Sequence, residues 1–152
     1  MKLLPFFILI VLALSPAARA QVGLSKPECD TRYKKPLTSI AGGANPKFAS
    51  YVYRSVTQNL QIGFDADVAA YALVKKQTGA PFTDLELQGA LDASGNKSGW
   101  WDDGWRGAFR HWHRNDKTAY ATYDKGHNLF IVWTAASGLD AGAVNAMNRL
   151  GL

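Results

Sequence analysis

The first twenty residues limit what this chain can fold into, because they have the pattern of a secretory signal peptide. Lys2 precedes an apolar stretch over residues 3–14, and Ala18-Arg19-Ala20 gives a small-x-small cleavage site before Gln21. The apolar stretch is shorter than the ~20 residues that a membrane helix needs, and no later segment approaches that length. We therefore predict a periplasmic or secreted protein with no membrane span.

Removal of 20 of the 152 residues leaves a mature chain of 132, which is enough for one hydrophobic core and too short for two. Lys2 and Arg19 leave with the signal, so the formal net charge falls from +5 to +3. Such mild basicity argues against nucleic acid as a partner. We predict three regions: a signal peptide over 1–20, an irregular lead-in over 21–44, and a single compact α+β domain over 45–152.

Cys29 is the only cysteine of the chain, so no disulfide can form within one molecule. Its thiol could be buried and inert, could join two copies, or could act as a nucleophile. Glu28 and Asp30 flank the sulfur and should raise its pKa, which disfavours the nucleophile. We expect a monomer, or a dimer through Cys29.

Periodicity predicts helices in the first part of the domain. One is expected from Asn45 and a second over 67–76, because apolar residues recur there at helical steps. The stripe of the first contains Phe48, Tyr51, Val52, Val56 and Leu60. Thr83 and Glu86 have the spacing of a capping box, which predicts that a third, short helix begins there.

The pattern changes after residue 115. Residues 118–123 and 128–134 are rich in aromatic and β-branched side chains and flank the turn-forming residues 124–127, so they predict a β-hairpin. Residues 138–150 return to helical spacing, and no internal repeat is visible. The predicted fold class is α+β, with N-terminal helices, a small antiparallel sheet (a hairpin or a three-stranded meander) and a C-terminal helix.

Residues 100–114 hold four of the five tryptophans, two of the three histidines and three arginines. As a helix, the segment would place its aromatic residues on one buried stripe. As one strand, it would place His111 and His113 on a face with Trp105, and Arg106 and the other arginines on the opposite face. Two interior glycines would each cost a helix ~1 kcal/mol. The two interpretations remain open.

Tryptophan and arginine are typical anchors of binding interfaces, so this segment is the candidate binding site. The candidate residues are Trp100, Trp101, Trp105, Arg106, Arg110, Trp112 and Arg114. The sequence thus favours a small exported binding protein, such as an inhibitor or immunity protein against an envelope-acting enzyme, or a polysaccharide-binding factor. Its partner would be another protein or an envelope polysaccharide.

The alternative is a small secreted hydrolase, a nuclease or a cell-wall hydrolase, in which histidines transfer protons. Its candidate catalytic residues are His111, His113 and His127. The spacing of these histidines matches no established zinc motif, so we predict neither a metal nor a cofactor.

Overall fold

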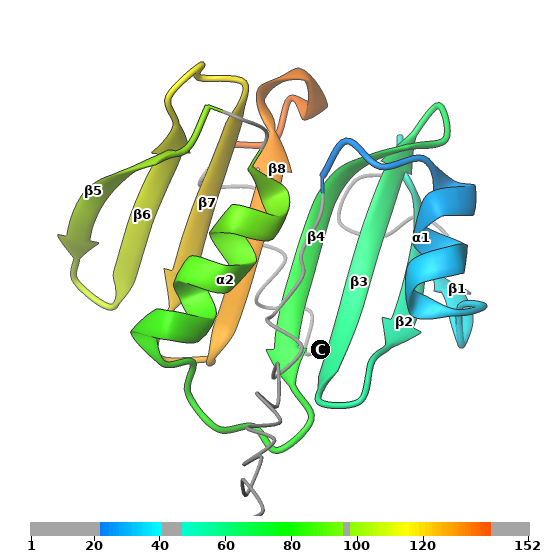
Figure 1. Ribbon diagram of the computed structural model, residues 1–152, viewed down its shortest axis with the longest axis horizontal. Coiled ribbons are helices and arrows are strands. Elements are labelled where there is room, and N and C mark those ends of the chain that lie inside the picture. Colours follow the sequence, from blue (N-terminus) through cyan, green and yellow to red (C-terminus); the bar gives the residue numbers. More distant parts are fainter. Residues whose placement is uncertain (1–21, 41–46, 96–97, 141–152) are drawn as a thin grey trace, which may run out of the picture.

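An eight-stranded antiparallel sheet is the central feature of the computed structural model of this protein (Figure 1). The structure describes residues 22–40, 47–95 and 98–140. The strands are β1 (Thr38–Ile40), β2 (Ala49–Arg54), β3 (Gln58–Asp65), β4 (Val68–Lys76), β5 (Trp100–Arg106), β6 (Phe109–Arg114), β7 (Ala119–Asp124) and β8 (Leu129–Thr134). The helices are α1 (Lys26–Tyr33), α2 (Asp84–Ser94) and a 3-10 turn, η1 (Ala135–Ser137). The strand order is β1-β2-β3-β4-β8-β7-β6-β5.

The predicted α+β fold class is therefore wrong, because the protein is mostly β. The two helices predicted from Asn45 and over 67–76 are strands β2, β3 and β4. Residues on both faces of β3 and β4 are buried, so the apolar side chains do not alternate with polar ones. A short apolar run without alternation cannot be distinguished from a helix by its period.

The segment 21–44, predicted as an irregular lead-in, contains α1 and β1. The Glu28 carboxylate accepts hydrogen bonds from the Ser25 backbone N–H at 2.8 Å and from the Ser25 hydroxyl at 2.7 Å. This is the Ser-x-x-Glu spacing of a helix N-terminus, and Pro27 lies within the first turn. The signal that correctly predicted a helix after Thr83 was thus also present here.

Two local predictions are confirmed. The Glu86 carboxylate accepts from the Thr83 N–H, and the Thr83 hydroxyl accepts from the Glu86 N–H, at the start of α2. Strands β7 and β8 pair as the predicted hairpin. The signal peptide and nearly all of the helix predicted over 138–150 lie outside the described residues. No helix within the described ranges is long and apolar enough to cross a membrane.

The described part of the chain has two halves with the same order of elements, although the sequence shows no repeat. Each half is a helix followed by a four-stranded meander, and the last strands of the two halves, β4 and β8, pair at the centre of the sheet. Both helices lie on the same face, α1 over the first half and α2 over the second (Figure 1). We call this the helix face and the other side of the sheet the open face.

Each face carries a buried apolar cluster. The cluster on the helix face joins residues of both helices to all strands from β2 to β4 and from β6 to β8. The cluster on the open face comprises Phe48, Ala70, Tyr71, Leu73, Leu129, Ile131, Trp133 and Leu139. The central strands are therefore apolar on both sides, which explains their uninterrupted hydrophobic runs.

Cys29 lies inside the helix-face cluster with no exposed surface. Burial, and next the Asp30 carboxylate, raise the pKa of its thiol to about 11. A rise of this size lowers the thiolate fraction at pH 8 about a hundredfold. We expect a thiol reagent at pH 8 to modify the native protein at least about a hundredfold more slowly than the protein in denaturant. Rapid native labelling, or a disulfide-linked dimer on a non-reducing gel, would contradict this burial.

Candidate functional site

The segment 100–114 is a β-hairpin, which decides between the two interpretations left open by the sequence. Arg106 pairs with Phe109, so Gly107-Ala108 forms a two-residue turn between β5 and β6. Gly107 has a φ of +65°, a conformation that glycine adopts without strain. A bulge between Asp102 and Gly104 adds one residue to β5.

The turn changes which side chains share a face. Residues paired across an antiparallel hairpin point the same way, so Trp105 lies with Arg110 on the helix face. Arg106 lies with Phe109 on the open face, together with His111 two residues along the strand. The one-strand interpretation placed Trp105 with the histidines and Arg106 with the other arginines, and both placements are therefore wrong. They assumed that residues 100–114 form a single continuous strand.

Arg110 and Trp112 make contacts within the fold. The Arg110 guanidinium binds the Asp102 carboxylate at 2.6 Å and the Asp84 carboxylate of α2 at 2.8 Å, and it lies 5.1 Å from the centre of the Trp112 ring. Its hydrogen bond lowers the pKa of Asp102. Trp112 is 5% exposed and its ring packs against Phe130. These contacts join β6 to β5, to α2 and to the core.

Trp100 and Arg114 hold the end of α2. The Trp100 indole N–H donates to the Leu91 carbonyl at 2.6 Å, and Arg114 donates to the Ser94 carbonyl at 3.4 Å. Arg114 also binds the Asp116 carboxylate and the Thr118 hydroxyl. Both side chains thus join the end of α2 to the β5–β6 hairpin.

Trp101, Trp105 and Arg106 remain exposed. Trp101 is 62% exposed on the open face, whereas Trp105 is 49% exposed on the opposite face, where its ring contacts Tyr123. The Arg106 guanidinium makes no hydrogen bond or ion pair with any residue that the structure describes. Trp101 and Arg106 share the open face, so one partner could contact both.

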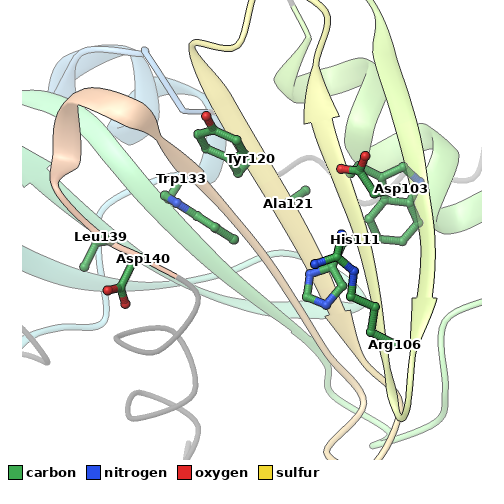
Figure 2. A pocket seen from close by; sticks show the side chains of 9 residues that line it. Asp103, Arg106, His111, Tyr120, Ala121, Trp133, Leu139 and Asp140 are labelled. Carbon is green, nitrogen blue, oxygen red and sulfur yellow. The ribbon is translucent and has the colours of Figure 1, made fainter.

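A pocket of about 330 Å³ opens on this face of the second half (Figure 2). Arg106, His111 and Asp103 lie at one end of it, and Leu139 and Asp140 lie at the other.

Tyr120 and Trp133 lie between the two ends of this pocket (Figure 2). Their rings are stacked, with centroids 5.9 Å apart and an interplanar angle of 28°. Ala121 and Trp112 complete the lining. The pocket therefore combines charged ends with an aromatic wall.

The structure brings two of the three candidate histidines together. His111 lines the pocket, and its Nδ1 lies 2.9 Å from the Thr122 hydroxyl. His113 is on the same face, with Nδ1 2.9 Å from the Asp103 carboxylate. His127 lies in the β7–β8 turn, where it binds the Asp124 carboxylate at 2.7 Å, and it does not line the pocket.

Burial, followed by the positive charge of Arg106, lowers the pKa of His111, while the Asp103 carboxylate opposes this effect. The His111 imidazole is therefore neutral near pH 7. Within residues 22–40, 47–95 and 98–140, no three histidine, cysteine or acidic side chains gather as a metal site.

The candidate binding residues did not include Tyr120 and Trp133, nor Asp103 and Asp140. These come from β7, β8, the β5 bulge and the segment after η1. In the observed hairpin Asp124 pairs with Leu129, which places Tyr120 opposite Trp133. The turn predicted over 124–127 would instead place Tyr120 opposite Ile131. The predicted hairpin therefore did not identify the aromatic wall, because its turn is shifted by one residue.

Comparisons with known proteins give no relative: no protein-family model, no curated protein and no solved structure matches this chain. The function must therefore be inferred from the site itself.

Proposed function

We propose that this is an exported binding protein whose open face at β5–β7 binds another protein or an envelope polysaccharide. The observation that carries the proposal is the exposure of Trp101 on the same face as a preformed pocket and as Arg106, which has no ion-pair partner among the residues that the structure describes. Tryptophan and arginine are the residues most enriched among interface hot spots. The predicted signal peptide supports an extracytoplasmic partner, and an inhibitor or immunity protein against an envelope-acting enzyme is one form of this function.

A hydrolase is the second candidate, and the observation that favours it is the histidine arrangement. His113 is hydrogen-bonded to the Asp103 carboxylate, and the neighbouring neutral His111 could accept a proton inside the pocket. Arg106 could stabilise a developing negative charge nearby. His127 does not line this pocket and has no part in this version of the mechanism.

Single substitutions Trp101→Ala and Arg106→Ala test the binding function. The mature protein is titrated by calorimetry against envelope-acting hydrolases and against soluble envelope oligosaccharides. Where a partner binds, each substitution should weaken binding by about 2 kcal/mol, because it truncates an exposed anchor. Leu85→Ala is the matched control, since Leu85 is 84% exposed on α2 at the helix face and should leave the affinity unchanged.

Two results would contradict the binding proposal. One is binding that is unaffected by either substitution on the open face. The other is turnover of RNA, DNA or peptidoglycan that is abolished in His111→Ala, which would establish the hydrolase instead.

A further inference from the structure

We propose that the open-face pocket is a subsite for an acidic sugar residue, whose carboxylate is bound by Arg106 and His111. This inference rests on the proposed binding function and adds to it the chemical class of the ligand.

The cationic end of the pocket supplies the carboxylate contacts. Arg106 and His111 lie next to each other there (Figure 2), and the Arg106 guanidinium has no partner among the described residues. The guanidinium presents a planar fork of donors that matches the two oxygens of a carboxylate. When the His111 Nδ1 accepts from the Thr122 hydroxyl, Nε2 carries the proton, makes no hydrogen bond with the residues that the structure describes, and can donate to the same ligand group.

The aromatic wall favours a sugar ring over an extended peptide side chain. The rings of Tyr120 and Trp133 are stacked between the two ends of the pocket, with an interplanar angle of 28°. Trp133 is 5% exposed, so the half-buried Tyr120 supplies most of the aromatic surface that a ligand can contact. The faces of aromatic rings carry partial negative charge and attract the weakly positive C–H groups that cover one side of a pyranose. A ring lying on this wall would direct a carboxyl substituent toward Arg106 and His111.

The size and charge of the pocket indicate how large the bound group is and how much negative charge it carries. A volume of about 330 Å³ lies at the lower end of small-ligand pockets and suits one sugar residue of a chain that continues outside. Asp103, already paired with His113, and Asp140 also line the pocket. These two carboxylates would repel a phosphate monoester, which carries nearly two charges, more strongly than a carboxylate, which carries one.

Matched acidic and esterified oligosaccharides test the subsite. The wild-type protein is titrated at pH 5.0 and 7.5 with oligouronates of several stereochemistries, with muramic-acid fragments, and with the methyl esters of the same compounds. At least one acid should bind about tenfold or more tightly than its ester, because esterification removes the charge that Arg106 recognises. Arg106→Gln should remove this preference. Arg54→Gln, which removes the same charge from β2 in the other half, should keep it.

Acidification should strengthen binding of the acid. The titratable and charged groups around His111 are Arg106, Asp103, His113, Tyr120 and Asp140. His111 gains a positive charge only below its lowered pKa, so binding should be tighter at pH 5.0 than at 7.5 while the sugar carboxylate stays ionised. His111→Gln should lose this dependence and His113→Gln should retain it.

The outcomes separate this inference from the proposed function. Three results would overturn the subsite. The acids and their methyl esters could bind equally tightly, triglutamate could bind as tightly as the best acidic sugar, or no acidic sugar could bind at all. If a protein partner still binds and depends on Trp101, the proposed function stands without the subsite. If Trp101→Ala has no effect on any partner, the proposed function fails as well.

Discussion

Trp112→Ala should lower the free energy of unfolding by about 4 kcal/mol, because it removes a large aromatic side chain from the core. Trp112 is 5% exposed, packs against Phe130 at a centroid distance of 6.2 Å, and supports the guanidinium of Arg110 on its ring face. Urea denaturation followed by circular dichroism measures the change.

Trp101→Ala is the matched control for this experiment. Trp101 is on the same hairpin but is 62% exposed, so its removal should change stability by less than about 0.5 kcal/mol. If Trp112→Ala kept wild-type stability and instead lost a ligand, Trp112 would belong to the binding surface and the assignment of faces would be wrong.

Gly63→Ala should destabilise the protein by about 3 kcal/mol, because the new methyl group has no space. Gly63 of β3 pairs with Tyr71 of β4, and a Cβ on Gly63 would lie 2.0 Å from Cε1 of the Tyr71 ring. Tyr71 has no exposed surface and its hydroxyl is hydrogen-bonded to Ser50 at 2.7 Å. The ring therefore cannot move away without losing buried contacts.

A double-mutant cycle identifies the cause. In a Tyr71→Ala background the clash is absent, so adding Gly63→Ala should cost less than about 1 kcal/mol. Independent, additive effects of the two substitutions would show that Gly63 is required for a reason other than the space it leaves for Tyr71.

Local signals in the sequence identified some elements of the fold correctly. The Thr83–Glu86 capping box identified the start of α2, and the β-branched and aromatic residues around 124–127 identified the β7–β8 hairpin. These signals depend on neighbours within a few residues. The strands β3 and β4 were missed because burial on both faces removes the alternation that identifies a strand.

The sequence singled out the segment that lines part of the pocket, but it did not show which of its residues share a surface. Residues 100–114 contain Trp101, Arg106 and His111, all of which face the open side. Which residues share that side depends on the two-residue turn and on the bulge, each of which shifts the alternation by one position. Gly104 and Gly107 weakened the helix interpretation, and they occupy that bulge and that turn.

The rest of the pocket could not be derived from this segment alone. Tyr120 and Trp133 reach it from β7 and β8, and Asp140 reaches it from beyond η1. Their positions depend on strand order and register across the sheet, which arise from tertiary pairing.

The pairing of β4 with β8 has a consequence for how the chain folds. Every other pairing in the sheet joins strands that follow one another in the sequence, so each meander can form from local contacts. Among the strand pairings, the contact of residues 71–75 with residues 129–133 closes the longest loop, so it carries the largest entropic cost of ordering. We therefore expect the encounter of the two meanders to be the slowest step in assembling this sheet.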